Sequence, residues 1–146
     1  MTPIDVTKNI LLVEDQLSHQ DLILEALEES HFQPQVHIVK NGEEALDFLY
    51  CKNNHAKSPR PDLILLDLNL PKMDGRELLS IVKQDSQLQL IPIVVFTTST
   101  AEVDVIKSYS LHANCYITKP SDLDKFFNCV RAIVEFWLMI VTPPPQ

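Results

Sequence analysis

The chain lacks the residue patterns that mark several common classes of protein. Its three cysteines contain no CxxC pair, and its five histidines contain neither HxxxH nor HExxH, so we expect no zinc site. The apolar run 136–141 is far shorter than the roughly 20 residues of a membrane span. The N-terminus lacks the basic and then apolar order of a signal peptide. Scattered cysteines fit a reducing compartment, so we expect a cytoplasmic protein with no membrane segment.

Basic residues are also in the minority. Lys and Arg number 12 against 20 Asp and Glu, a formal net charge of −8. Because an extended nucleic-acid surface needs clustered basic side chains, no nucleic-acid partner is expected. What remains is a chain of 146 residues, 45% of them hydrophobic, which suits one domain with a sizeable core. We expect a leader over residues 1–7, the domain over 8–141 and a Pro-rich tail over 142–146.

Five apolar runs of strand length alternate with five segments of helical periodicity. The predicted strands are 9–13, 35–39, 63–66, 92–96 and 113–117. The predicted helices are 17 to about 30, 43–53, 75 through 82, 101–111 and 122 to about 141. Continuous apolar strands are typical of a parallel sheet that is buried on both faces. With right-handed crossovers, the pattern predicts an α/β fold, a doubly wound five-stranded parallel sheet with five helices.

Polar residues stand where these strands end. Glu14 and Asp15 follow the first strand, Asp67 follows the third, Thr97 follows the fourth and Lys119 follows the fifth. In such sheets, ligands bind beyond the carboxyl ends of the strands. We therefore expect these side chains to lie on one edge of the sheet, although they are far apart in the sequence.

Asp67 is the most informative of these residues about the chemistry at this edge. A carboxylate that ends a buried strand needs compensation of its charge, and Glu14 and Asp15 would repel it unless a cation lay between them. Mg²⁺ prefers oxygen ligands, so the edge predicts a magnesium site. A carboxylate can also attack phosphorus and form an acyl phosphate, which makes Asp67 a candidate nucleophile. The Thr97 hydroxyl and the Lys119 ammonium would suit the phosphoryl oxygens.

Each of these residues also has an ordinary structural interpretation. The pair Glu14–Asp15 suits the cap of a helix, and Asp67 suits a cap or a loop. The hydroxyls after the fourth strand, such as Ser99, suit helix capping as well as they suit function. A lone lysine is usually solvated, so Lys119 is informative only beside three carboxylates. Pro120 after it raises the chance of a cis bond, which would turn the chain sharply and fix the direction of the lysine.

Taken together, these segments resemble the receiver domain of two-component response regulators. The resemblance covers nearly the whole chain and is carried by Leu11–Asp15, Asp67–Gly75, Thr97 and Lys119–Pro120. It implies a flavodoxin-like sheet with strand order 2-1-3-4-5, and a receiver domain over residues 8–141 with an extended C-terminal helix.

The same resemblance implies a role for each residue of the acidic group. Asp67 would be the phosphoacceptor that receives a phosphoryl group from a histidine kinase. Asp15 and Asp67 would bind Mg²⁺ through their side chains, Glu14 through water, and Asn69 through its backbone carbonyl. The protein would be no enzyme beyond phosphorylating and dephosphorylating itself.

It further implies a conformational switch. Thr97 and Lys119 would hold the phosphoryl oxygens, and Thr97 would move toward the phosphoryl group while Tyr116 turns inward to fill the space. Without the resemblance, Tyr116 reads as an ordinary aromatic residue of a strand.

The predicted last helix carries more apolar surface than a helix on a sheet needs. One stripe runs through Phe126, Val130, Ile133, Trp137 and Val141, and further apolar residues surround it. We expect a homodimer through this helix and its neighbouring surface, and the alternative is packing within the chain itself.

A narrower resemblance concerns the phosphodonor. Residues 51–71, with Thr97–Ser99 and Phe136–Trp137, are similar to the small stand-alone regulators partnered with cyanobacterial phytochromes. This implies a phytochrome-type histidine kinase as donor, and output through phosphorylation-dependent binding of a further, unidentified protein. No second domain is expected.

Two other functions are compatible with part of the pattern. A phosphatase of the haloacid-dehalogenase type also uses an Asp after a strand, but it needs a second Asp two residues later, where this chain has Asn69. A degenerate receiver that only docks to partners is the other alternative. The intact set of Asp15, Asp67, Thr97 and Lys119 argues against it.

Overall fold

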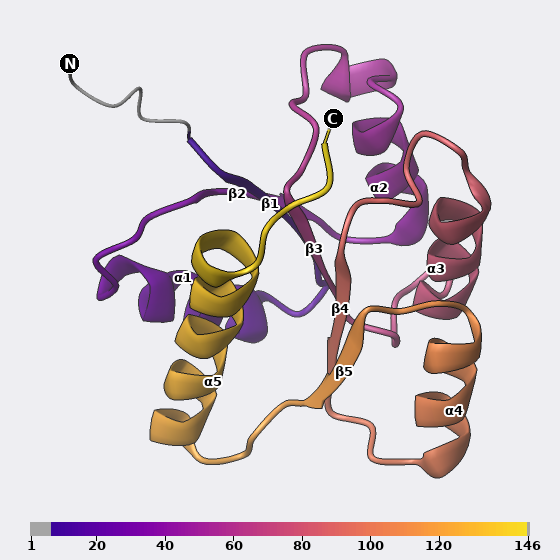
Figure 1. The fold of residues 1–146 in the computed structure, drawn as a ribbon. Coiled ribbons are helices and arrows are strands. Elements are labelled where there is room, and N and C mark those ends of the chain that lie inside the picture. The colour runs from indigo at the N-terminus through magenta and orange to yellow at the C-terminus, as the bar shows by residue number, and fades with distance from the viewer. Residues whose placement is uncertain (1–6, 146) are drawn as a thin grey trace, which may run out of the picture.

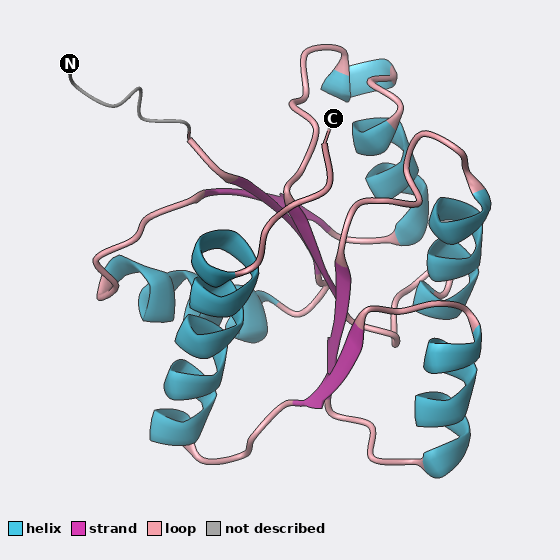
Figure 2. Cartoon of the chain, in the orientation of Figure 1, coloured by secondary structure: helices cyan, strands magenta, loops and turns pink. Residues whose placement is uncertain are grey.

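The sheet has the predicted architecture in the computed structural model, which describes residues 7–145. Five parallel strands form one sheet in the order β2-β1-β3-β4-β5, with helices on both faces (Figure 1, Figure 2). The elements are β1(Asn9–Val13), α1(Leu17–Glu28), β2(Gln35–Val39), α2(Gly42–Leu49), η1(Asn53–His55), β3(Leu63–Leu66), α3(Gly75–Gln84), β4(Ile93–Thr97), α4(Glu102–Ser110), β5(Cys115–Thr118), α5(Leu123–Glu135) and η2(Phe136–Ile140). The leader predicted over residues 1–7 lies outside the described residues, except for Thr7.

Side chains of the strands alternate between two apolar layers. On one face, Leu11 and Val13 belong to a core that includes residues of α2 and α3. On the other face, Ile10 and Leu12 belong to a core shared with α1 and α5. Figure 1 shows α1 and α5 on one side of the sheet and α2, α3 and α4 on the other. Because both faces are covered, the central strands β1, β3 and β4 are mostly apolar and buried. The edge strand β2 is less buried and contains Gln35 and His37.

The helix α2 is shorter than predicted. It begins after Asn41, whose side chain accepts a hydrogen bond from the Glu44 amide at 2.9 Å. It ends at Leu49, and Cys51 and Asn53 then take left-handed backbone conformations with φ of 56° and 54°. An α-helix cannot contain such residues, so the predicted helix to residue 53 is four residues too long.

The last helix changes its type near its end. Asp122 caps α5 by accepting a hydrogen bond from the Lys125 amide at 2.9 Å. The chain then widens into the π-helical turn Phe136–Ile140, in which the Val141 amide donates to the Phe136 carbonyl at 2.9 Å. The predicted helix to about residue 141 has the correct extent but not this change. No helix within residues 7–145 is both long and apolar enough to cross a membrane.

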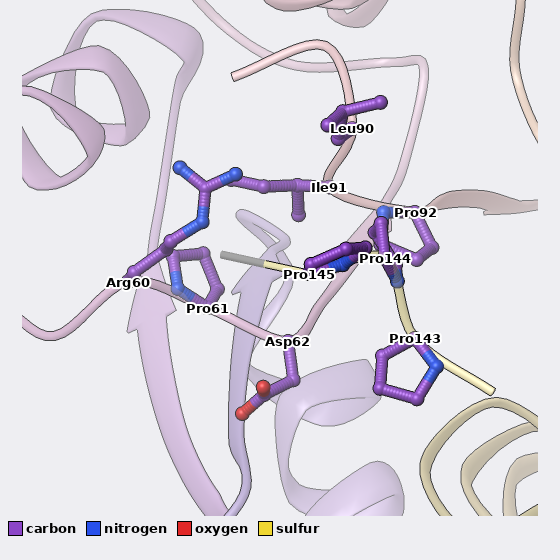
Figure 3. Close-up of a pocket in the computed structure, with 9 residues that line it drawn as sticks. All are labelled: Arg60, Pro61, Asp62, Leu90, Ile91, Pro92, Pro143, Pro144 and Pro145. Carbon is purple, nitrogen blue, oxygen red and sulfur yellow. The ribbon is translucent and has the colours of Figure 1, made fainter. Parts of the chain in front are cut away.

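The C-terminal prolines lie at the amino ends of the strands. Pro143–Pro145 line a small pocket together with Arg60–Asp62 and Leu90–Pro92 (Figure 3). These two partner segments directly precede β3 and β4. The prolines therefore contact the edge of the sheet that is opposite to the predicted site, which leaves the carboxyl ends of the strands clear.

Candidate functional site

The residues predicted at the strand ends do lie together at the carboxyl edge of the sheet. Glu14, Asp67 and Lys119 directly follow β1, β3 and β5, and Thr97 is the last residue of β4. The Asp67 amide donates to the Val13 carbonyl at 3.1 Å, and the Lys119 amide donates to the Thr97 carbonyl at 2.7 Å. These backbone bonds extend the ladders beyond the strands, so a rigid edge presents side chains from distant parts of the sequence.

The ammonium of Lys119 lies at the centre of this edge. Its Nζ donates to Asp67 Oδ2 at 3.0 Å, to Glu14 Oε1, and to His19 Nδ1 at 2.8 Å. The side chains of Lys119, Glu14 and Asp67 are 2%, 1% and 6% exposed. One buried ammonium therefore compensates two buried carboxylates, and with Asp15 beside them the site keeps an excess of negative charge.

The pKa values of the two buried carboxyl groups shift in opposite directions. Burial alone raises the pKa of a carboxyl group. At Asp67 burial acts in that direction, but the Lys119 ammonium outweighs it and holds the pKa below its usual value. At Glu14 burial outweighs Lys119, and the pKa is raised. Asp67 is therefore kept in the ionised form that a carboxylate nucleophile needs.

Two buried polar atoms at this edge have no hydrogen-bond partner among the described residues. They are Asp15 Oδ1 and Thr97 Oγ1. Leaving a buried polar atom unpaired costs about 1–3 kcal/mol, and a bound ion or group commonly explains such an atom. A carboxylate oxygen suits a hard divalent cation, and a hydroxyl can donate to an anionic oxygen. The residues present therefore fit both a divalent cation and a phosphoryl group.

Three side chains at this edge could in principle bind a metal ion, but in this structure they bind Lys119 instead. Glu14, His19 and Asp67 offer ligand atoms that lie within 4.8 Å of one another. Since the Lys119 ammonium contacts all three, they are hydrogen-bond acceptors in this conformation. The unpaired oxygen for a cation belongs to Asp15. Asn69 lies two residues after Asp67, and its amide donates to Asp67 Oδ1 at 3.2 Å.

Tyr116 is tied to the loop that follows β4. Its hydroxyl donates to the Ser99 carbonyl at 2.9 Å. The Ser99 hydroxyl donates to Asp104 at 2.6 Å, and Arg76 of α3 pairs with the same carboxylate. Because Ser99 lies two residues after Thr97, this loop connects the carboxyl edge to the aromatic ring.

The cis bond whose chance Pro120 raises is not present. Among the described residues no peptide bond is cis, so the bond between Lys119 and Pro120 is trans. The direction of the lysine side chain comes instead from its three acceptors and from its backbone bond to β4.

His19 is a residue of this edge that we did not predict from the sequence. It stands alone in the sequence, so no metal-binding spacing reveals it. The available signal was its place four residues after Asp15, in the first turn of a helix that begins at the same edge of the sheet. Long-range pairing with Lys119, 100 positions later, could be found only in the folded chain.

This sheet, with an acidic edge and a lysine at the end of its fifth strand, has the architecture of a receiver. The chain belongs to the response regulator receiver domain family, which matches residues 10–131. The response regulator Rcp1 of Synechocystis sp. strain PCC 6803 is 50% identical over 137 residues, which cover 94% of this chain and 93% of Rcp1.

Solved structures agree with this assignment. The phosphorylated cyanobacterial phytochrome response regulator RcpA is 48% identical, with a TM-score of 0.91 over 96% of this chain and 100% of that chain. The Mn²⁺-bound form of Rcp1 is 49% identical, with a TM-score of 0.89 over 94% and 99% of the two chains. The strand order and both resemblances drawn from the sequence are confirmed.

Membership of this family defines a class of activity. Receiver domains are signalling phosphoacceptors that take a phosphoryl group from a kinase, bind a divalent metal ion, and are not conventional enzymes. The chain is therefore a response regulator, and the phosphatase alternative is set aside.

Proposed function

We propose that Asp67 is the phosphoacceptor, that Asp15 and Asp67 bind Mg²⁺, and that Thr97 and Lys119 bind the phosphoryl oxygens. The main support for this proposal is the contact of 3.0 Å between Lys119 Nζ and Asp67 Oδ2. The Lys119 ammonium lowers the pKa of Asp67 and so favours its ionised form. The unpaired atoms of Asp15 and Thr97 at the same edge support it. The transition state of phosphoryl transfer is loose, so positioning and countercharge are the main contributions that a protein can make.

These residues then have defined tasks in the transfer. An Asp67 carboxylate oxygen forms a bond to phosphorus while the bond from phosphorus to the donor's leaving group breaks. Lys119 and the Thr97 hydroxyl donate to the phosphoryl oxygens. When bound, Mg²⁺ would compensate the charge of the phosphoryl group. Asp15 and Asp67 would hold it through their side chains, Glu14 through water and Asn69 through its backbone carbonyl.

We infer that the donor is a phytochrome-type histidine kinase, because RcpA, a phytochrome response regulator, is similar along nearly its whole length. Output would pass through Thr97 and Tyr116 to an unidentified partner protein. The net charge of −8 argues against nucleic acid as that partner. The free thiols of Cys51, Cys115 and Cys129 agree with a reducing compartment, and we place the protein in the cytoplasm.

Acetyl phosphate with Mg²⁺ tests this function. We expect intact-mass measurement to show one phosphoryl adduct, which EDTA prevents and which disappears with time as the protein dephosphorylates itself. A generic phosphatase substrate should not be turned over. Absence of any adduct in Mg²⁺ would instead support the degenerate receiver that only docks to partners.

We also propose a homodimer through the last helix and its neighbouring surface. Phe136, Met139 and Ile140 are exposed, and an apolar groove of about 480 Å³ lies between β5 and the end of α5. β5 is an edge strand, so nothing pairs with its outer side within the sheet. A second copy would cover this surface.

Sedimentation at micromolar concentration tests the dimer, with and without a phosphoryl mimic. The wild type should sediment as a dimer, and Ile140→Glu should shift it toward monomer by placing a charge in the contact. Leu17→Glu is the matched control, since Leu17 is equally exposed but lies at the start of α1. A monomeric wild type in both conditions would contradict the dimer.

A further inference from the structure

His19 is the one acceptor of the Lys119 ammonium, among the described residues, that is not a carboxylate. It comes from the first turn of α1, and its side chain is 21% exposed. Its ring lies 6.3 Å from the ring of Phe126 in α5, measured between centroids. The imidazole is thus held between two helices and reaches Lys119 from the outer side of the site.

The hydrogen-bond chemistry fixes the state of this imidazole. A lysine ammonium has three N–H donors and no acceptor, so His19 Nδ1 must accept and the ring proton must sit on Nε2. Burial and the positive charge of Lys119 both lower the pKa of His19, which agrees with a neutral ring. The three acceptors Glu14, His19 and Asp67 then match the three N–H bonds of the ammonium one for one.

We propose that His19 is a positioning residue for phosphoryl transfer: together with Glu14 it holds two N–H bonds of Lys119, so that the third points at Asp67. This inference rests on the proposed function of Asp67. On transfer, only the third N–H changes its acceptor, from the Asp67 carboxylate to a phosphoryl oxygen. The other two bonds stay, and the lysine does not have to be ordered during the reaction.

Loss of this acceptor would free a flexible side chain. Lysine has a four-carbon stem that adopts many rotamers, and its direction depends on what its ammonium contacts. Without His19, one N–H inside a nearly closed site has no acceptor, and the ammonium can shift away from Asp67. The transfer would then be slower although Asp67, Asp15 and Thr97 are unchanged.

The test compares three proteins with acetyl phosphate at saturating Mg²⁺. His19→Leu removes the acceptor at similar size, and His19→Asn keeps an acceptor, Oδ1, at the place of Nδ1. We expect the phosphorylation rate constant to fall about tenfold in His19→Leu, the size of one lost hydrogen bond to a charged group. His19→Asn should stay within about twofold of the wild type. If the Leu variant does not fold, His19→Ala takes its place.

Several outcomes would overturn the proposal. Equal rates for all three proteins, or an Asn variant as slow as the Leu variant, would show that the acceptor is irrelevant. A slower rate with the kinase alone, and not with acetyl phosphate, would make His19 a docking contact. Lower Mg²⁺ affinity with an unchanged rate at saturation would make it a metal ligand. If the wild type takes no phosphoryl group at all, the function proposed for Asp67 fails, and not merely the role of His19.

Discussion

Replacing Asp67 with Asn is expected to abolish the phosphoryl adduct and to leave the protein folded. An amide has the shape of the carboxylate but lacks the anionic oxygen that attacks phosphorus, so the rate should fall more than about 100-fold. The fold should persist, because the Lys119 ammonium keeps Glu14 and His19 as partners. Intact-mass measurement after acetyl phosphate and Mg²⁺ gives the adduct, and thermal melting gives the folded state.

Asp62→Asn is the matched control for this substitution. Asp62 precedes β3 as Asp67 follows it, and its carboxylate accepts a hydrogen bond from the Asn9 amide at 2.8 Å. Asp62 lies at the amino end of β3, away from the proposed site, so its carboxylate should not take part in phosphoryl transfer. We therefore expect a wild-type amount of adduct in Asp62→Asn. Normal phosphorylation of Asp67→Asn would contradict the assignment of the phosphoacceptor.

Gly75→Ala is expected to destabilise the protein by about 3 kcal/mol. Gly75 begins α3, and its amide donates to the Leu68 carbonyl at 3.0 Å. A Cβ there would lie 2.5 Å from the Asp67 carbonyl oxygen and 2.7 Å from Leu68 Cα. Both are backbone atoms, so the helix or the loop after β3 must move. Because that loop carries Asp67, the variant should also be phosphorylated more slowly.

Gly42→Ala separates this clash from a general effect of adding a methyl group. The three heavy atoms nearest to a Cβ on Gly42 would be Met73 Cβ and Cγ, both at 2.8 Å, and Met73 Sδ at 2.9 Å. Met73 Cγ and Sδ can rotate away, but Met73 Cβ moves only with its backbone, so we expect a loss of about 1 kcal/mol, smaller than that of Gly75→Ala, where both contacts are with backbone atoms. Urea unfolding of both variants without Mg²⁺ makes the comparison. Equal stabilities would show that the close approach of α3 to the Asp67 backbone is not a tight constraint.

The part of the site that the sequence predicts is the part that follows from strand ends. Asp67 and Lys119 each follow an apolar run. A parallel sheet brings the carboxyl ends of its strands to one edge, and this does not depend on the conformation of the loops. The positions of Glu14, Asp15 and Thr97 follow by the same reasoning. The alternation of apolar runs with helical segments likewise predicts the layers, and the strand order came from the resemblance to receivers.

Other parts depend on side-chain directions that no local pattern records. His19 reaches Lys119 only because the first turn of α1 faces the edge, and Arg76 meets Asp104 only because α3 and α4 are neighbours. The trans bond at Pro120 and the π-helical turn Phe136–Ile140 are likewise not marked by any local pattern in the sequence. Proline raises the frequency of cis bonds but does not determine one.

The most direct test of the central proposal identifies the phosphorylated residue itself. Borohydride reduces an aspartyl phosphate to homoserine, which marks the acceptor permanently and can be located by peptide mass. After acetyl phosphate, Mg²⁺ and borohydride, we predict homoserine at position 67 and at no other aspartate. Homoserine at Asp15, or at any position other than 67, would contradict the proposal that Asp67 is the phosphoacceptor.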